Sequence, residues 1–337
     1  MEVFVQQDSQ GTTSLEGLAM KQLINFCPVH GYKEEIDLYP NKMSGFLKDT
    51  NLDGIELYVY DTVPYEDDYS EFTTGVHLKY WPYWLDFWQI NYTELLRNHN
   101  SKKDMQVYFC GAENREQWLD VIRKNIIAAC DVKPEYLVWH VSHCGLAEYF
   151  TRKYIYTDEQ IIDSTIEVFN EISSVIPKNV KVLFENLWWP GLTLLQTKLV
   201  DKLFTNVNKD NVGIMLDTGH LMNTNMDLKS EAEAIHFIKS VVKSLGSNKD
   251  LIKGMHFSCS LSGEYQKSSI SSKYCIDDMR EIFEHIAKID QHRVFKEARL
   301  KEFIEYIAPE YLIHELFYDT MSQVQEYVKH EQSLMKQ

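Results

Sequence analysis

The sequence predicts an α/β fold of the (β/α)8 TIM-barrel type. About eight short apolar runs of strand character alternate with stretches whose apolar residues recur at helical spacing, as in a parallel barrel. The later runs end in His, Glu or Asp, and 337 residues suit one large barrel with insertions. A doubly wound open sheet is the alternative. It is disfavoured because no Gly-x-Gly-x-x-Gly turn follows any run. In addition, too many strands end in ligand-type residues for all of them to meet at the single switch point of an open sheet.

All of these elements are expected in one domain. Residues 1–20 lack a clear period and form an irregular N-terminal arm, while residues 21–337 form a single barrel with an inserted helix at about 270–289. The expected strands are 23–27, 53–59, 74–80, 134–140, 180–185, the first half of 211–220, 251–257 and 310–316. The expected helices are 41–49, 113–129, 157–172, 192–204, 230–245, 276–287, 295–307 and 321–330. Thr157 and Gln160 form a capping box at the start of one of them.

An aromatic segment, Tyr80 to Trp88, follows the third expected strand. Its rings could line a pocket or cover the open end of the barrel. They could equally pack as a satellite core beneath a loop. Both interpretations stay open on the sequence alone.

Composition narrows the classes of protein. Hydrophobic residues make up 44% and charged residues 25%, as in an ordinary globular protein, and no apolar run is long enough for a membrane span. The first residues lack the pattern of a signal peptide, so a cytoplasmic location is expected. The 6 cysteines show no Cys-x-x-Cys spacing, which argues against a disulfide framework or a thiolate zinc site. A net charge of −16 argues against nucleic acid as a partner. A small carbohydrate is the expected substrate, and a homo-oligomer is compatible with the sequence.

The stretch from Asn211 to His220 organises the expected site. Its apolar first half reads as a strand buried on both faces, and it ends in Asp217, Thr218, Gly219 and His220. Because glycine can turn sharply, Asp217 and His220 can converge just beyond the carboxyl end of the strand. The alternative is a turn in which Asp217 caps the following backbone and His220 lies at the surface.

Other expected strands end in the same kind of side chain. In a barrel the carboxyl ends of all strands open on one face, so these residues can meet there. They are His77, His140, Glu185, Asp217, His220, His256 and Glu315. Imidazole and carboxylate ligands without thiolate suit Zn²⁺ or Mn²⁺, with Mg²⁺, Co²⁺ and Fe²⁺ as further candidates. Several acids crowded together also need cations to offset their repulsion.

Three segments resemble one superfamily, the xylose isomerase-like barrels. They are 182–186 (Val-Leu-Phe-Glu-Asn), 212–220 (Val-Gly-Ile-Met-Leu-Asp-Thr-Gly-His) and 252–258 (Ile-Lys-Gly-Met-His-Phe-Ser). The superfamily includes sugar isomerases and epimerases and the abasic-site endonucleases of the endonuclease IV type (AP endonuclease family 2). The resemblance extends from about residue 22 to the end of the chain.

The resemblance implies roles for individual residues. In the sugar-isomerising members, the residues matching Glu185, Asp217, His256 and Glu315 hold the metal, and the two glutamates also move protons. In the endonuclease-type members, two or three zinc ions use these positions together with those matching His77, His140, His220 and an Asp-x-His pair. Here Asp290 and His292 resemble that pair. Two departures from the endonuclease pattern are Ser258-Cys259-Ser260, where Asn-Asp-Ser is usual, and the missing glycine near Val294 and Phe295.

Two enzymatic functions and one non-enzymatic function fit this pattern. The first is a metal-dependent isomerase or epimerase of a sugar, sugar phosphate or polyol, with Glu185 and Glu315 as the catalytic proton carriers. The second is a multi-zinc phosphoester hydrolase of the endonuclease IV type. Glu185, Asp217, Asp290 and Glu315 carry four negative charges, so one divalent ion leaves the pocket near −2 and three leave it near +2. Only the second pocket attracts phosphate. A barrel that keeps its ligands for structure or binding alone is the third hypothesis.

Overall fold

The computed structural model describes residues 20–28, 31–65, 69–99, 101–271, 279–296 and 300–336. The expected N-terminal arm lies outside the described residues except for its last position, Met20. Part of the expected inserted helix, residues 272–278, also lies outside them. None of the described helices is both long enough and apolar enough to cross a membrane.

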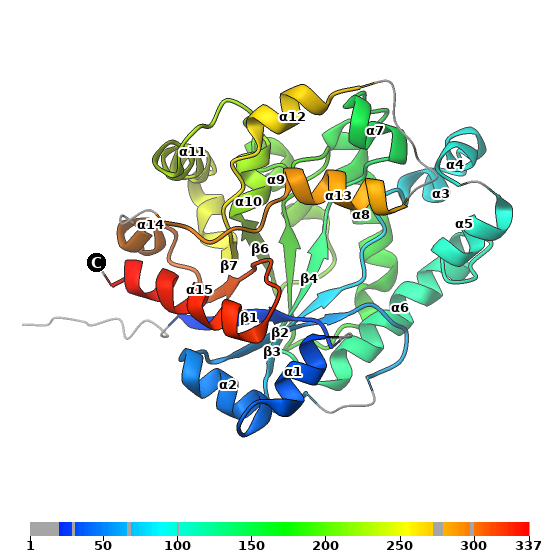
Figure 1. Cartoon of the computed structure of the whole chain (residues 1–337). Coiled ribbons are helices and arrows are strands. Elements are labelled where there is room, and N and C mark those ends of the chain that lie inside the picture. The colour runs from blue at the N-terminus through cyan, green and yellow to red at the C-terminus, as the bar shows by residue number, and fades with distance from the viewer. Residues whose placement is uncertain are drawn as a thin grey trace, which may run out of the picture.

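Eight parallel strands close into a barrel in sequence order, which confirms the TIM-barrel prediction (Figure 1). They are β1 (Lys21–Phe26), β2 (Gly54–Val59), β3 (Thr73–Leu78), β4 (Tyr136–His140), β5 (Lys181–Glu185), β6 (Val212–Asp217), β7 (Ile252–Phe257) and β8 (Tyr311–His314). Every strand pairs with the next along the chain, and β1 pairs with β8 to close the ring. Closure leaves no unpaired sheet edge and directs all the carboxyl ends to one face.

Helices surround the barrel on its outside (Figure 1). They are α1 (Tyr32–Leu38), α2 (Lys42–Thr50), α3 (Leu85–Gln89), α4 (Tyr92–Asn98), α5 (Lys102–Tyr108), α6 (Arg115–Asp131), α7 (Leu146–Thr151), α8 (Asp158–Ile172), η1 (Ser173–Val175), α9 (Thr197–Asn206), α10 (Thr218–Asn223), α11 (Glu231–Ser244), η2 (Gly246–Leu251), α12 (Gly263–Ser269), α13 (Met279–Ile289), α14 (Leu300–Ile307) and α15 (Met321–Leu334). The capping box at Thr157 and Gln160 is present at the start of α8. The expected insertion thus contains α13, which follows the separate helix α12.

The two-residue period of the strands divides the core into an inner and an outer layer. In β5, Val182 and Phe184 pack outward against the helices, whereas Leu183 belongs to a separate cluster inside the barrel. By the same alternation, Glu185 points inward one layer above Leu183. The same alternation applies to the other strands. The last inward-pointing side chain of each strand therefore lies at the carboxyl end of the barrel, where these side chains can meet.

Two helix starts differ from the sequence prediction. The expected helix at 192–204 begins only at Thr197, because Gly191 forms a bridge with Ser142 and Leu194 adopts a left-handed φ of 63°. The expected helix at 295–307 is seen as α14 from Leu300; Phe295 is instead held by a hydrogen bond from its amide to Glu331. The expected helix at 276–287 is described from Met279 and continues to Ile289.

Candidate metal centre

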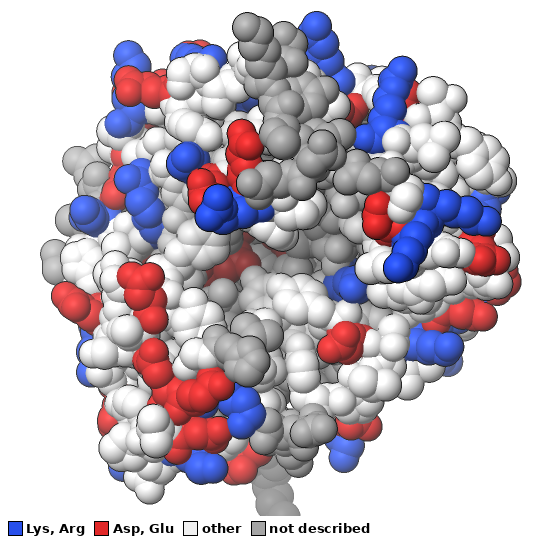
Figure 2. All heavy atoms as spheres, turned by 45° about the vertical axis from the view of Figure 1, so that its right-hand side comes forward, with Lys and Arg blue, Asp and Glu red and all other residues white. Residues whose placement is uncertain are grey.

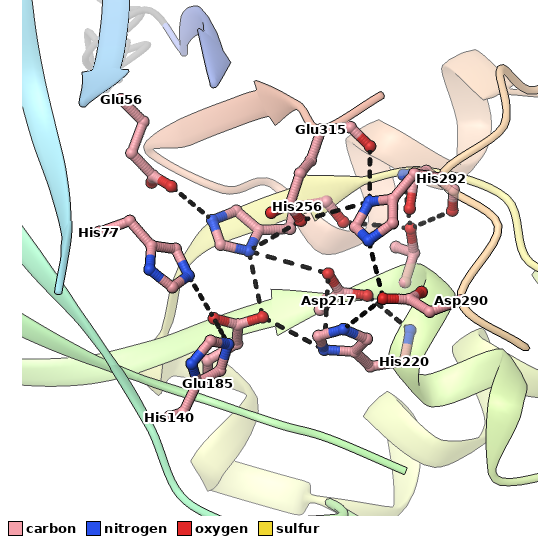
Figure 3. A network of polar contacts seen from close by, with 12 residues as sticks. Glu56, His77, His140, Glu185, Asp217, His220, His256, Asp290, His292 and Glu315 are labelled. Carbon is pink, nitrogen blue, oxygen red and sulfur yellow. Dashed lines mark hydrogen bonds and ion pairs between the residues drawn. The ribbon is translucent and has the colours of Figure 1, made fainter. Parts of the chain in front are cut away.

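All nine predicted site residues meet at the carboxyl end of the barrel. Figure 3 shows their side chains pointing toward one another from the ends of neighbouring strands and from the segments that follow them. All are buried except His140, which is partly buried. Their donor atoms form three groups compact enough to hold a metal ion, and Glu185 belongs to two of them; a fourth such group joins His77 and His256 to Glu56. We call the three groups the first, second and third donor sets.

The first donor set consists of Glu185, Asp217, His256 and Glu315. Nδ1 of His256 lies 3.3 Å from Oε1 of Glu185, 3.3 Å from Oε2 of Glu315 and 3.8 Å from Oδ2 of Asp217. The other oxygen of Asp217 accepts the backbone N–H of His220 at 2.6 Å. Asp217 is therefore both the N-cap of α10 and a member of the set, whereas the alternative that places His220 at the surface is wrong, because His220 is buried.

The second donor set consists of His77, His140 and Glu185. Oε2 of Glu185 lies 3.0 Å from Nε2 of His140 and 3.3 Å from Nε2 of His77. Its other oxygen, Oε1, faces the first set. The carboxylate of Glu185 is thus placed between two donor sets and could bridge two ions.

The third donor set consists of His220, Asp290 and His292. Oδ2 of Asp290 lies 3.1 Å from Nε2 of His220 and 2.7 Å from Nε2 of His292. A bridge between Cys259 and Arg293 holds the loop that carries the pair, and His292 adopts a left-handed φ of 41°. In the segment 258–260, Cys259 departs from the endonuclease pattern but forms that bridge, and Ser260, which matches the pattern, accepts the amide N–H of Gln291 at 2.8 Å. The departure is therefore compatible with an assembled third set.

Backbone carbonyls orient three of the site histidines. Nδ1 of His77 lies 3.1 Å from the carbonyl oxygen of Leu78. Nδ1 of His220 lies 2.9 Å from that of Asn186, and Nδ1 of His292 lies 3.0 Å from that of Glu315. A carbonyl only accepts, so each Nδ1 must carry the proton. Each Nε2 is therefore the ring nitrogen that faces the donor set, and it can bind a metal ion once it carries no proton.

The first set passes a test of fit for a metal ion. Both oxygens of Glu185, Oδ2 of Asp217, Nδ1 of His256 and Oε2 of Glu315 are buried without any hydrogen-bond partner. Buried polar atoms are normally satisfied, and these orphan atoms all belong to one group of donors. Imidazole and carboxylate donors of this kind suit a divalent ion such as Zn²⁺ or Mn²⁺.

The ionisation of the centre also indicates a need for cations. Burial alone would raise the pKa of Glu185, but the histidines around it, led by His140, hold that pKa well below its ordinary value. Burial raises the pKa of Asp217 well above its ordinary value; His220 opposes this rise, and neighbouring carboxylates add to it. The histidines therefore neutralise some of the carboxylates but not all of them.

Two further residues of the centre were missed by the sequence analysis, Glu56 and Tyr58. Oε1 of Glu56 lies 2.9 Å from Nε2 of His256, and the hydroxyl of Tyr58 donates to Oε1 of Glu315 at 2.6 Å. Both residues lie on β2 with their side chains in the inward row. They were missed because they lie before the end of the strand. The alternation of inward and outward side chains along β2 is the sequence signal that could have pointed to them.

The aromatic segment from Tyr80 to Trp88 contributes mainly to packing. Trp81, Trp84 and Trp88 belong to the outer core and contact Trp118 of α6. Tyr80 alone among these rings contacts a described donor, with its ring 4.4 Å from that of His140. Most of the segment therefore packs into the main core rather than into a satellite core, and Tyr80, Trp81 and Trp84 also line a cavity beside His140.

His143, which follows the same strand as His140, lies outside the donor sets. Its Nδ1 accepts the amide N–H of Leu85 at 3.1 Å, and its ring packs against Tyr156. It is a structural residue of the loop that follows β4.

The fold and the site define a class: a TIM barrel with histidine and carboxylate donors gathered at its mouth. The profile of the xylose isomerase-like TIM barrel family matches residues 46–337. The chain therefore belongs to this family. No curated protein matches the sequence.

Solved structures share the fold at low sequence identity. A candidate xylose isomerase from Rhodospirillum rubrum is 14% identical with a TM-score of 0.55, and the match covers 93% of this chain and 99% of that one. Endonuclease IV from Thermus thermophilus is 9% identical with a TM-score of 0.50, covering 94% and 99%. A D-tagatose 3-epimerase-like protein is 13% identical with a TM-score of 0.48, covering 94% and 98%.

Proposed function

We propose that the chain is a metal-dependent phosphoester hydrolase whose centre holds three divalent ions, zinc being the best fit to its five histidines. The observation that carries this proposal is the third donor set, in which Oδ2 of Asp290 lies within 3.1 Å of His220 and His292. A single-metal isomerase has no use for that set. The sequence pattern alone favours the isomerase, whereas the assembled third set favours the hydrolase.

The surroundings of Glu185 support the same choice. An isomerase would need this carboxylate to remove or return a proton at carbon. Ring nitrogens of His77, His140, His220 and His256 lie within 3.3 Å of its two oxygens. A carboxylate so enclosed is better suited to bridging two ions than to accepting a substrate proton.

Charge counting favours three ions more strongly now that Glu56 is included. Glu56 joins Glu185, Asp217, Asp290 and Glu315, so the buried centre carries five carboxylates. With neutral histidines, one divalent ion would leave the centre near −3, and three would leave it near +1. Only the second value attracts an anionic phosphoester.

The residues divide the work of such a hydrolase. Divalent ions supply polarisation of the phosphoryl oxygens and activation of water near neutral pH. Glu185 holds the first two sets at a fixed separation, while Asp290 ties His220 to His292 in the third. Tyr58 fixes the rotation of Glu315, so that Oε2 faces the first set. The surrounding burial keeps bulk water away from these charges.

A small phosphoester, such as a sugar phosphate, is the substrate class that we propose. The chain's net charge of −16 opposes binding of long polyanions but does not exclude a small anion from a locally positive pocket. The family, and similar folds such as the candidate xylose isomerase and endonuclease IV, support an enzymatic role.

Elemental analysis and a two-class substrate panel test the proposal. Protein purified without added metal should contain close to three equivalents of zinc or manganese per chain. It should hydrolyse phosphomonoesters or phosphodiesters and leave ketose sugars unchanged. One equivalent of metal together with ketose epimerisation would overturn the proposal in favour of the isomerase.

A further inference from the structure

Glu56 is a buried carboxylate one layer away from the three donor sets. It lies on β2 and is completely buried. Oε1 lies 2.9 Å from Nε2 of His256, and Oε2 accepts the hydroxyl of Tyr136 at 2.8 Å (Figure 3 shows the contact with His256). Burying a carboxylate is costly unless it is paired and hydrogen-bonded, so this arrangement requires a compensating role.

The barrel interior is shaped to hold this carboxylate. Tyr136, on β4, reaches Glu56 only because Gly75, on β3, has no side chain: a Cβ atom there would lie 2.0 Å from Cζ of Tyr136 and 2.4 Å from its hydroxyl oxygen. Tyr136 is itself completely buried. Three neighbouring strands thus supply the carboxylate, the hydroxyl that orients it and the space that the hydroxyl occupies.

Glu56 differs from the donor residues in its hydrogen bonding. Each of its oxygens has a partner, whereas Oε2 of Glu315 and both oxygens of Glu185 have none. On the ring of His256, Nε2 faces Glu56 and Nδ1 is the unpaired atom that faces the first donor set. Glu56 therefore contacts the first donor set through His256, and both of its oxygens are already engaged by protein partners.

His256 is also distinguished from the other oriented histidines. Neutral backbone carbonyls fix the rings of His77, His220 and His292, whereas a carboxylate fixes that of His256. A carboxylate partner fixes the tautomer and also increases the basicity of the nitrogen that binds metal. The first set, which already has three carboxylates, would thus gain a stronger nitrogen donor.

We propose that Glu56 is a positioning residue that holds the proton of His256 on Nε2 and directs Nδ1 toward the ion of the first donor set. Tyr136 supports it by fixing the carboxylate. The inference rests on the metal centre proposed above. On this inference, the first donor set binds its ion with the highest affinity of the three. The residue responsible for the difference, Glu56, is not itself a ligand.

The test compares Glu56→Gln with a matched change elsewhere. Glu331 is also a completely buried carboxylate bonded to a histidine, with Oε2 2.6 Å from Nδ1 of His314, but it lies away from the centre. Zn²⁺ affinities would be measured by chelator competition, and Co²⁺ loading would be followed by its visible absorption spectrum. Thermal unfolding of the metal-free proteins would report any effect on the fold.

We expect Glu56→Gln to lower the affinity for one Zn²⁺ ion by roughly 10- to 100-fold and to alter the Co²⁺ spectrum of that site. The affinities for the other two ions should stay unchanged. Tyr136→Phe should produce the same selective change to a smaller extent and serves as the second variant if Glu56→Gln folds poorly. Glu331→Gln should lower thermal stability without changing any Zn²⁺ affinity.

Three results would overturn the inference. Wild-type Zn²⁺ affinities and Co²⁺ spectra in both Glu56→Gln and Tyr136→Phe would reduce Glu56 to a structural role. Binding of a fourth ion by the wild type, lost in Glu56→Gln, would make Glu56 a ligand together with His77 and His256, whose atoms also lie close enough. Absence of Zn²⁺ binding by the wild type would remove the proposed function as well, so the two failures are distinguishable.

Discussion

The hydroxyl of Tyr58 lies 2.6 Å from Oε1 of Glu315, and this contact selects which oxygen of that carboxylate faces the metal centre. Oε2 is left without a hydrogen-bond partner at 3.3 Å from Nδ1 of His256. Tyr58 also packs its ring 4.6 Å from that of His77, in the second donor set. One side chain on β2 therefore touches residues of two sets.

Replacement of Tyr58 by Phe should lower turnover while keeping the metal. Without the hydroxyl, Glu315 can rotate, and loss of such a supporting contact typically costs about 10- to 100-fold in activity or metal affinity. Steady-state kinetics on the phosphoester found by the panel, with elemental analysis of the same sample, would measure both quantities. Tyr39→Phe is the matched control, because Tyr39 donates to Asp49 away from the centre. Equal kinetics in both variants would contradict the role assigned to Tyr58.

Glu185→Gln and Glu315→Gln should both abolish turnover but should differ in metal content. Glu185 belongs to the first and second donor sets, whereas Glu315 belongs only to the first. Each change preserves shape and removes one negative charge, so the fold should survive. Elemental analysis should show a larger loss of metal from Glu185→Gln. Normal activity in either variant would contradict the site role of the residue that it replaces, and an equal loss of metal from both would show that Glu185 does not bridge.

Metal loading should release protons at neutral pH. In the metal-free protein, burial would lower the pKa of His292, but Asp290 outweighs it and raises that pKa to about 10. His292 therefore stays protonated at pH 7 and must lose its proton to bind an ion. The stability that this raised pKa contributes is fully present below the ordinary value of 6.5 and is lost as the pH rises through about 10.

Calorimetric titration with Zn²⁺ in buffers of different ionisation enthalpy would count the released protons. Asp290→Asn is the comparison, because loss of the carboxylate should lower the pKa of His292 and reduce the number released. A heat of binding independent of the buffer would rule out the predicted coupling.

The fold was readable from the sequence because strand and helix periods are local, whereas parts of the centre depend on tertiary structure. Strand ends identified donors such as Asp217 and His256, since a barrel brings all carboxyl ends together. Glu56 was missed because only the closed barrel shows that its inward row reaches His256. The helix expected at 192 begins later because of a bridge between Ser142 and Gly191, a contact between distant segments that no local period reports.

Duplex DNA containing an abasic site should bind no better than about 10⁻⁴ M at physiological salt, the weak end of non-specific binding. The net charge of −16 opposes a polyanion, and the face in Figure 2 mixes basic with acidic side chains without a continuous basic band. A gel-shift assay at micromolar protein, with single-stranded DNA alongside, would measure this. A clear shift on abasic duplex would replace the small phosphoester with nucleic acid as the proposed substrate.

The double variant Asp290→Ala/His292→Ala decides between the two enzyme classes. If the third donor set holds an ion, the variant should lose one equivalent of metal per chain and its hydrolytic activity, because His220 alone cannot retain that ion. The first and second sets contain neither residue, so two equivalents should remain. The exposed pair His236→Ala/Asp250→Ala provides the matched control, since it removes the same two side-chain types from the surface. Both measurements are needed, because a variant that kept all its metal but lost activity would make the pair part of substrate binding. Full metal and full activity would remove the main support for the hydrolase and return the isomerase to first place.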